Sequence, residues 1–258
     1  MNKKSEIFEV SFVGLIPARY ASTRFPGKPI ADIGGKPMIQ RVYERVSEAL
    51  GACAVATDDV RIADVVMGFG GRVIMTSTCH KSGTDRLAEA VSKMEAEDGR
   101  NYDVVVNIQG DEPFIRPEQV RLLSSAFADP EVKIATLVKK ADNEHDLFNP
   151  NKPKVVMSAE GNALYFSRAP IPYLRGVPEH DWLSQHTYWN HIGLYAYRTN
   201  VLHKLTKLPQ GDLEKCESLE QLRWLENGYA IRALVTELES LSIDTPEDLE
   251  ELKRRGLI

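Results

Sequence analysis

The sequence predicts an α/β fold built on a doubly wound, mostly parallel sheet. Short apolar segments alternate with helical patterns, and 43% of the 258 residues are hydrophobic, which is enough to fill a core of this size. The apolar segments are nearly continuous runs rich in Val and Ile, as is typical of strands covered on both faces. These observations indicate β-α-β-α order, and such folds bind their ligands at the carboxyl ends of the strands.

The first half of the chain supplies the regular part of this pattern. Between the first two strands, residues 38–50 carry apolar side chains at helical spacing, with Pro37 at the first turn and Gly51 just past the end. The strands are predicted at residues 11–16, 53–57, 72–75 and 103–108.

Residues 140–190 interrupt the regular order. The segment is rich in proline and polar residues, with short strand candidates at 154–158 and 163–167, before 191–197 again has a clear strand pattern. We expect an inserted arm that covers a site or pairs with another subunit. It is too short for a separate domain, so residues 1–258 are expected to form a single domain.

The composition limits the classes of function. The formal net charge is −5 at pH 7, which argues against general nucleic-acid and membrane-surface binders because these rely on a broad positive field. No stretch approaches the ~18–20 apolar residues needed to span a bilayer, and acidic residues interrupt the N-terminal MNKKSEIFEV before a signal-peptide core develops. The three cysteines are far apart and form no CxxC. We therefore expect a cytoplasmic protein with no nucleic-acid or membrane partner.

A cationic turn follows the first predicted strand. The segment LIPARYASTRFPGKP contains a Pro-Gly turn and carries Arg19, Arg24 and Lys28. A turn from a parallel strand to a helix exposes backbone N–H groups, which bind phosphates well when cations stand beside them. The alternative is a solvated basic loop. Neither GxxxxGK[ST] nor GxGxxG is present, so a P-loop kinase and a nicotinamide-dependent oxidoreductase lose support.

Two carboxylates are expected at the same edge of the sheet. VVVNIQGDEP ends a buried strand and delivers Asp111, and SIDTPEDL places Asp244 after another apolar run. Mg²⁺ takes one or two carboxylates together with phosphate oxygens, so these acids complement the cationic turn. Each carboxylate also has a simpler explanation. Asp111 could belong to an acidic turn that caps the helix beginning near Pro117. Asp244 could belong to the capped first turn of the charged helix TPEDLEELKRR.

A series of motifs in this order resembles the 3-deoxy-manno-octulosonate (Kdo) cytidylyltransferases, the CMP-Kdo synthetases of lipopolysaccharide biosynthesis. The motifs are LIPARYASTRFPGKP, ATDD, HKSGTDRLAEA, VNIQGDEP, ALYFSRAPIP, HIGLYAYR, SLEQLRWLENG and IDTPEDL. Other sugar nucleotidyltransferases share the opening motif in looser form, whereas SGT, FSR, HIGLY and LEQLR together are specific to this family. The resemblance covers the chain from about Ser11. It implies a Rossmann-like nucleotide-diphospho-sugar transferase architecture, CTP and an acid sugar as substrates, Mg²⁺ as cofactor and a homodimer.

The resemblance also implies a role for each matching residue. The nucleotide is expected to contact Arg19, Arg24, Lys28, Ser82, Gly83 and Gln109. The acid sugar is expected to contact Gln109, Arg168, His191, Tyr195, Glu220 and Gln221. Mg²⁺ is expected on Asp111 and Asp244, which form the catalytic set with Arg19 and Lys28.

The sugar-binding set suits its substrate chemically. Kdo carries a carboxylate beside its anomeric centre and several hydroxyls, so its pocket needs a cation, an aromatic surface and hydrogen-bonding groups. Taken singly, each residue could have a purely structural role. Tyr195 could pack within a strand, Glu220 and Gln221 could lie on the exposed face of a helix, and His191 could be a semi-buried imidazole whose hydrogen bonds are satisfied.

The expected reaction is attack of the anomeric 2-hydroxyl of Kdo on the α-phosphorus of CTP, with loss of pyrophosphate. Arg19 and Lys28 are expected to steady the departing phosphates, and Mg²⁺ to orient and acidify the hydroxyl. No side chain stands out as a general base. Two alternatives stay open: the same reaction on 8-amino-Kdo or another acid sugar, and a catalytically silent nucleotide-binding relative.

Overall fold

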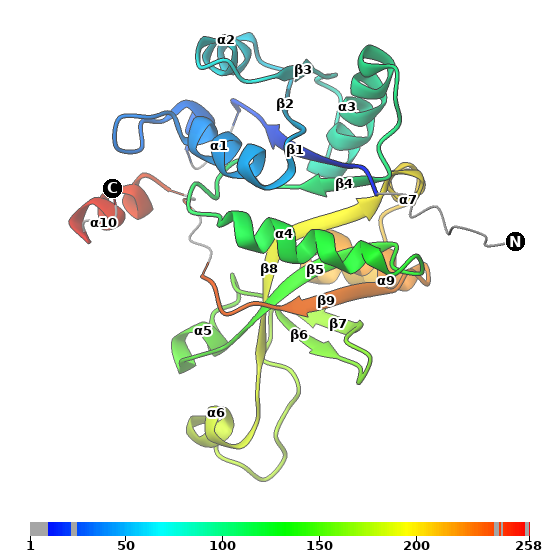
Figure 1. Ribbon diagram of the computed structural model, residues 1–258. Helices are drawn as coiled ribbons and strands as arrows, with labels where there is room; N and C mark the ends of the chain where they lie inside the picture. The colour runs from blue at the N-terminus through cyan, green and yellow to red at the C-terminus, as the bar shows by residue number, and fades with distance from the viewer. Residues whose placement is uncertain (1–9, 22–24, 240–242, 244, 256–257) are drawn as a thin grey trace, which may run out of the picture.

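A sheet of nine strands forms the centre of the molecule (Figure 1). The computed structural model describes residues 10–21, 25–239, 243, 245–255 and 258. The strands are β1 Phe12–Ala18, β2 Cys53–Thr57, β3 Val73–Met75, β4 Val104–Asn107, β5 Ile134–Lys140, β6 Lys154–Met157, β7 Ala163–Ser167, β8 Trp189–Arg198 and β9 Ile231–Val235. The helices are α1 Met38–Leu50, α2 Val60–Gly68, α3 Gly83–Asp98, α4 Pro117–Ser125, α5 Glu144–Phe148, α6 Trp182–Gln185, α7 Thr199–Leu205, α8 Asp212–Glu217, α9 Glu220–Glu226 and α10 Pro246–Arg254, with short 3₁₀ turns η1 Lys28–Ile30, η2 Ala126–Ala128 and η3 Glu179–Asp181.

The sheet is mixed but mostly parallel, which confirms the predicted fold class. The strand order is β3-β2-β1-β4-β8-β5-β9; off this path, β6 pairs with β8 and β7 pairs with β6. Strands β3, β2, β1 and β4 pair in parallel, as do β5 and β9. Only β8 along this path is reversed, because it pairs antiparallel with both β4 and β5.

Helices cover both faces of the sheet. Alternate residues of β1 point to opposite cores: Val13 and Leu15 pack on the side of α3, α7 and α9, whereas Ile16 and Ala18 pack on the side of α1, α2 and α4. Because both faces are buried, the strands show continuous rather than alternating apolarity. Gly14 lets α1 approach the sheet, since an added Cβ would lie only 2.3 Å from Val46 Cγ1.

The local signals at the helix ends act as the sequence predicts. α1 begins after Pro37 and ends at Gly51, whose φ of 72° lies in the left-handed region that glycine adopts without strain. Thr245 caps α10 in a reciprocal pair with Asp248: the Asp248 N–H donates to Thr245 Oγ1 at 3.2 Å, and the Thr245 N–H donates to Asp248 Oδ2 at 2.8 Å.

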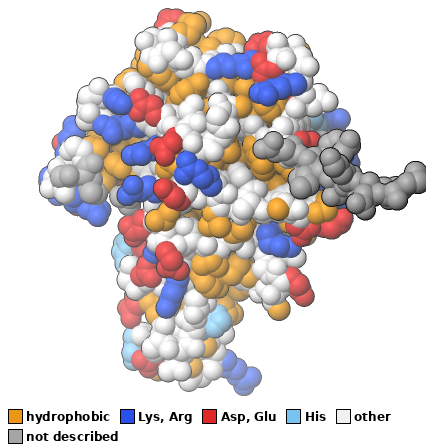
Figure 2. Space-filling view, in the orientation of Figure 1, with side chains coloured by type: hydrophobic (Ala, Val, Ile, Leu, Met, Phe, Trp, Pro, Cys, Tyr) orange, Lys and Arg blue, Asp and Glu red, His pale blue; other side chains and the backbone are white. Residues whose placement is uncertain are grey.

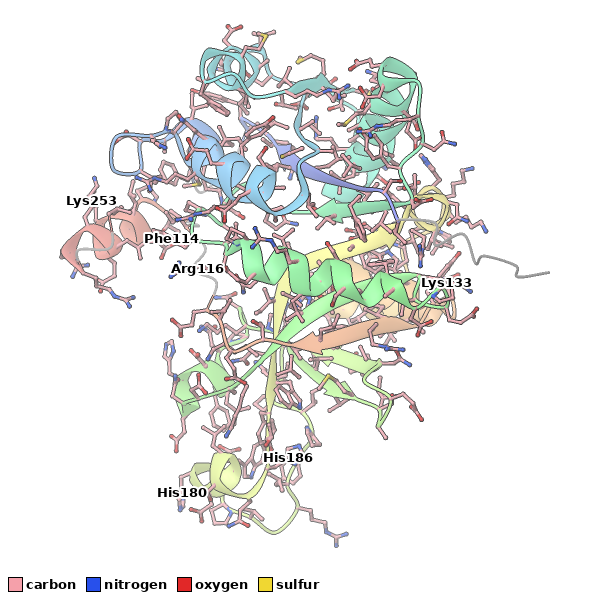
Figure 3. The ribbon with its side chains drawn as sticks, in the orientation of Figure 1. Phe114, Arg116, Lys133, His180, His186 and Lys253 are labelled. Carbon is pink, nitrogen blue, oxygen red and sulfur yellow. The ribbon has the colours of Figure 1, made fainter. Side chains whose placement is uncertain are left out.

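The predicted arm at 140–190 is partly an arm and partly sheet. Figure 1 shows α6 at the tip of an extension far from α1–α3, and Figure 3 places His180 and His186 there. A small aromatic cluster holds this tip, in which the rings of Trp182 and Tyr188 stack at 5.9 Å. The hairpin β6–β7, however, rejoins the sheet because β6 pairs with β8.

On the face drawn in Figure 2, Lys and Arg side chains lie among Asp and Glu side chains. Lys36 pairs with Glu44 at 2.8 Å, and Arg121 lies 3.6 Å from Glu48. Positive and negative charges therefore offset one another over this surface. Within the described part of the chain, no helix combines the length and the apolarity needed to cross a bilayer.

Candidate functional site

The cationic turn and the acidic turn meet at the carboxyl edge of the sheet. β1 and β4 are parallel neighbours, with Leu15 opposite Asn107. The turn after β4 passes close to β1, since an added Cβ at Gly110 would lie 3.2 Å from the carbonyl oxygen of Pro17. As a result, Lys28 Nζ lies 2.6 Å from Asp111 Oδ2, although 83 residues separate them.

Local geometry places Lys28 for this contact. Gly27 has φ 71°, and its N–H donates to the carbonyl oxygen of Tyr20 at 3.0 Å, which closes the loop that precedes η1. Lys28 opens η1 and has only 13% of its side chain exposed. Arg19 is exposed and makes no hydrogen bond or ion pair with another described residue. Arg24 lies outside the described residues.

The structure removes the simpler explanation for Asp111. The N-cap of α4 is Arg116 (Figure 3), whose N–H donates to Gln119 Oε1 at 3.1 Å, so Asp111 does not cap that helix. The C-terminal segment runs beside Asp111, because the N–H of buried Ile243 donates to the Asp111 carbonyl oxygen at 3.0 Å.

Asp244 itself lies outside the described residues, and the cap of α10 is supplied by Thr245. Within the residues described, no three His, Cys, Asp or Glu side chains are grouped so as to hold a metal ion. Asp111 still suits Mg²⁺, which in proteins binds one or two carboxylates and completes its shell with substrate phosphates and water.

The N-terminus of α3 faces the end of β1. Ser82 caps the helix, accepting from the Asp85 N–H at 3.1 Å, and an added Cβ on Gly83 would lie 3.5 Å from Pro17 Cγ. A helix N-terminus favours anions because its N–H groups are unpaired and its dipole is positive. The predicted nucleotide residues Ser82 and Gly83 therefore lie beside the strand that leads to the cationic turn.

A buried guanidinium fixes this helix to the sheet. Arg86 is 1% exposed, and its Nη2 donates to Asp58 Oδ2 at 2.8 Å while Nη1 donates to Thr76 Oγ1 at 2.5 Å. Asp58 follows β2 in the motif ATDD, for which the sequence suggested no separate role. The contacts tie the first turns of α3 to the carboxyl end of β2.

A cavity of about 210 Å³ brings together the predicted sugar-binding residues except Arg168. Its walls come from the end of β4, the middle of β8, the start of α3 and α9. The lining residues predicted from sequence are Gln109, His191, Tyr195, Glu220 and Gln221, and those not predicted are Thr84, Asn107, Gly193, Tyr197, Leu219 and Trp224.

Several buried hydrogen-bond donors of this cavity make no full hydrogen bond to a described residue. Nε2 of Gln221 and Nε1 of Trp224 make no hydrogen bond to a described residue. The Tyr195 hydroxyl faces Thr136, and the Tyr197 hydroxyl faces Asn107 and Thr84, but without the geometry of a full hydrogen bond. Burial raises the pKa of both tyrosines, so the hydroxyls stay protonated and able to donate. An unsatisfied buried donor is costly. All four residues line the cavity, so a ligand that reached these donors would have to offer acceptors.

Two other lining groups supply acceptors. Glu220 Oε2 accepts from Thr84 Oγ1 at 2.9 Å, and burial raises the pKa of the Glu220 carboxyl. Burial lowers the pKa of His191 to about 3, so its imidazole is neutral near pH 7. Thr84 belongs to α3, whose N-terminus carries the predicted nucleotide residues, and Glu220 belongs to α9. Their hydrogen bond therefore joins these two helices at the cavity.

Comparison with known proteins agrees with this arrangement. A family model described as "Cytidylyltransferase" matches residues 13–231. A 3-deoxy-manno-octulosonate cytidylyltransferase of Parabacteroides distasonis is 59% identical over 246 residues, which cover 94% of this chain and 96% of that protein. A protein of the same name from Bacteroides thetaiotaomicron is 57% identical, covering 96% of this chain and 100% of that one. The chain belongs to the 3-deoxy-manno-octulosonate cytidylyltransferase family.

A solved structure supports the same assignment. It is described as CMP:2-keto-3-deoxy-manno-octonic acid synthetase complexed with CTP, and it superposes with a TM-score of 0.86 at 43% identity, covering 96% of this chain and 98% of that one. The fold of this cytidylyltransferase is thus that of an enzyme crystallised with CTP.

Arg168 lies beside the cavity of the cytidylyltransferase but not in its lining. Its Nε donates to the Glu217 carbonyl oxygen at 2.6 Å, Nη1 to that of Pro150 at 2.8 Å and Nη2 to that of Ser218 at 3.3 Å. These contacts hold the connection between α8 and α9, where Ser218 has φ 52°. The predicted contact of Arg168 with the sugar stays a prediction.

Sequence reasoning missed Tyr197 and Trp224, although signals for both exist. Tyr197 follows Tyr195 at the strand period of two in HIGLYAYR, so both point to one face. Trp224 follows Gln221 by three residues on α9, so both lie on one side of the helix. In the sequence, each residue is explained more simply by packing in the core. Only the structure shows that both residues line the cavity.

Proposed function

We propose that this cytidylyltransferase transfers the CMP group of CTP to Kdo, giving CMP-Kdo and pyrophosphate. The observation that carries the proposal is the cavity lined by the donor-bearing residues Tyr195, Tyr197, Gln221 and Trp224, at the edge where Lys28 meets Asp111. Kdo offers a carboxylate and several hydroxyls as acceptors for those donors, and CTP offers phosphates to the cationic turn. The names of the relatives support the same pair of substrates.

The reaction forms one bond and breaks another at the α-phosphorus. The anomeric 2-hydroxyl oxygen of Kdo attacks this phosphorus and releases its proton to solvent. The bond between the α-phosphorus and the oxygen that bridges it to the β-phosphate breaks, and pyrophosphate leaves. Lys28 and Arg19 offset the negative charge that builds on the departing pyrophosphate. Donors on β8 and α9 hold the sugar, while Glu220 and His191 accept from its hydroxyls.

Mg²⁺ is the proposed cofactor, held by Asp111 and Asp244. When bound, it supplies positive charge at the reacting phosphate and favours the ionised form of the attacking hydroxyl. Asp111 already attracts a cation, since Lys28 Nζ lies 2.6 Å from its carboxylate. Lys28 is then expected to turn from Asp111 toward the phosphates as metal and nucleotide bind.

The protein is also proposed to be a cytoplasmic homodimer. All three cysteines are free, as in proteins of reducing compartments, and cell fractionation tests the compartment. The arm exposes large apolar side chains, with Tyr173 73% and Leu164 61% exposed, which suits contact with a second subunit near a two-fold axis.

Sedimentation velocity at micromolar concentration should give the mass of a dimer. Tyr173→Ser should shift the equilibrium toward monomer, because it removes an exposed aromatic ring from the proposed contact. Tyr229→Ser, on a partly buried tyrosine outside the arm, serves as the comparison. A monomer with full activity would refute the dimer.

Pyrophosphate release measured with each nucleotide and a panel of acid sugars tests the reaction. Turnover should require CTP rather than ATP or GTP, and it should be fastest with Kdo, with 8-amino-Kdo as the competing substrate. Arg19→Ala and Lys28→Ala should weaken CTP binding, because each removes a cation from the turn. Lys133→Ala, exposed at the opposite edge of the sheet (Figure 3), should not. Equal calorimetric affinity for CTP, ATP and GTP, or binding of CTP without turnover of any sugar, would overturn the assignment.

Asp244→Asn tests the metal site. The change should lower the rate of Kdo-dependent pyrophosphate release by about 10³-fold or more, because the transition state loses charge stabilisation. CTP binding should fall less, since the cationic turn is intact, and circular dichroism should show an unchanged fold. Asp212→Asn, which removes a surface carboxylate that is 92% exposed, is the matched control. A rate within about threefold of the parent at saturating Mg²⁺ would show that Asp244 does not hold the metal.

A further inference from the structure

The pairing of β5 with β8 shifts register beside the sugar cavity. Thr136 lies opposite Tyr195, but the next residue, Leu137, lies opposite Ile192. The extra residues of β8, Gly193 and Leu194, form a bulge. Bulges of this kind change the direction of nearby side chains, and both His191 and Gly193 line the cavity.

Thr136 of β5 lies opposite this bulge of β8 and is fully buried. Its Oγ1 lies 2.8 Å from the Leu194 carbonyl oxygen, 3.2 Å from that of Ile192 and 3.0 Å from His191 Nε2. The Thr136 hydroxyl therefore contacts two backbone acceptors and one imidazole nitrogen, and the Tyr195 hydroxyl also lies close to it.

The balance of donors and acceptors determines which group donates to which. A threonine hydroxyl has one proton and two lone pairs, whereas a carbonyl oxygen can only accept. If Thr136 donated its proton to His191, its oxygen would lie 2.8 and 3.2 Å from the carbonyl oxygens of Leu194 and Ile192 with no proton in either contact. Thr136 must therefore donate to a carbonyl. Its lone pair then accepts from the Nε2–H of His191.

This fixes the tautomer of His191. A neutral imidazole carries one proton, so with Nε2 protonated, Nδ1 is a bare acceptor. Burial keeps the ring neutral near pH 7. The rings of Phe166 and Tyr195, with centroids 5.1 and 5.2 Å away, pack against the imidazole and restrict its rotation.

The cavity of a polyhydroxylated ligand needs acceptors as well as donors. The side chains of Tyr195, Tyr197, Gln221 and Trp224 all carry donor atoms, and Glu220 and His191 lie among them in the lining. A sugar hydroxyl that accepts from one of these donors must also place its own proton on an acceptor.

We propose that Thr136 is a positioning residue that holds His191 as the Nε2–H tautomer, so that Nδ1 accepts a hydrogen bond from a hydroxyl of the acid sugar. The proposal rests on the proposed function for the identity of the ligand. The tautomer itself does not depend on the ligand, because it follows from the contacts of Thr136 alone.

Nitrogen-15 NMR of the histidine side chains in the unmodified protein tests the tautomer directly. The resonance of the unprotonated nitrogen should belong to Nδ1 of His191, with His191→Gln used to assign it. Thr136→Val removes the hydroxyl at nearly constant volume, and the His191 signals should then become those of a mixture of tautomers. Thr136→Ser keeps the hydroxyl and should preserve the parent spectrum.

Steady-state kinetics tests the consequence for the sugar. Thr136→Val should raise the KM for Kdo about tenfold, as expected for the loss of one hydrogen bond worth ~1.4 kcal/mol, and should leave the dissociation constant of CTP within about twofold. Thr136→Ser should restore the KM. A purely structural role for Thr136 would weaken CTP binding and sugar binding together.

If the spectrum of the parent protein shows that Nε2 of His191 is the unprotonated nitrogen, the proposal is overturned. This outcome does not depend on whether Thr136→Val folds. The proposal would also be overturned if folded Thr136→Val kept both the His191 tautomer and the KM for Kdo of the parent protein. Absence of turnover with every sugar would instead count against the proposed reaction, while the spectrum of the parent protein would still decide the tautomer.

Discussion

A buried hydrogen-bond donor must find an acceptor, and this protein leaves several such donors around a single cavity without a full hydrogen bond to a described residue. Nε2 of Gln221 and the indole N–H of Trp224 lose their water in the folded state and gain no protein partner among the described residues. The hydroxyls of Tyr195 and Tyr197 face neighbouring side chains without the geometry of a full hydrogen bond. Each costs free energy until a ligand accepts from it. A cavity of this kind favours a small ligand covered in oxygen atoms and disfavours an apolar one.

The topology of the sheet explains why this cavity lies next to the cationic turn. β4 runs toward the carboxyl edge, and its last residue, Asn107, lies opposite Tyr195 in the middle of the reversed strand β8. The chain continues from Asn107 into the turn that holds Asp111, which contacts Lys28. One strand end is therefore shared by the phosphate side and the sugar side. Two substrates bound there would be held close enough to react, which is a large part of catalysis in a two-substrate transfer.

Much of the fold could be predicted from the sequence because its signals are local. The apolar strands β1 to β4, the proline and glycine at the ends of α1, and the capping pair of α10 depend on neighbouring residues. Strands β5 and β9 were not identified, although both are apolar, because they lie in the half of the chain where the helical pattern between strands is short. The reversal of β8 depends on long-range pairing, for which the sequence carries no local signal.

The site was predictable where residue type itself implies chemistry. Lys28 and Asp111 were expected together on the basis of charge, and five of the six residues that the family resemblance assigns to the sugar line one cavity. The carbonyl contacts of Arg168 depend on the conformation of the loop after α8, and the hydroxyl of Thr136 depends on a shift in strand register. Neither feature has a sequence motif. Tyr197 and Trp224 look like core residues in sequence, and only the three-dimensional structure shows that both line the cavity.

The unfolding free energy of Tyr195→Phe in urea, without ligand, tests most directly whether the cavity donors are unpaired. Tyr188→Phe is the matched control, because the Tyr188 hydroxyl is buried and donates to the Pro172 carbonyl oxygen at 2.9 Å. If the Tyr195 hydroxyl lacks a partner, its removal should leave the free energy of unfolding unchanged or raise it, while weakening binding of the acid sugar. Tyr188→Phe should lower that free energy by about 1 kcal/mol. An equal loss of stability in both variants would show that the Tyr195 hydroxyl is already satisfied within the protein, and would contradict the account.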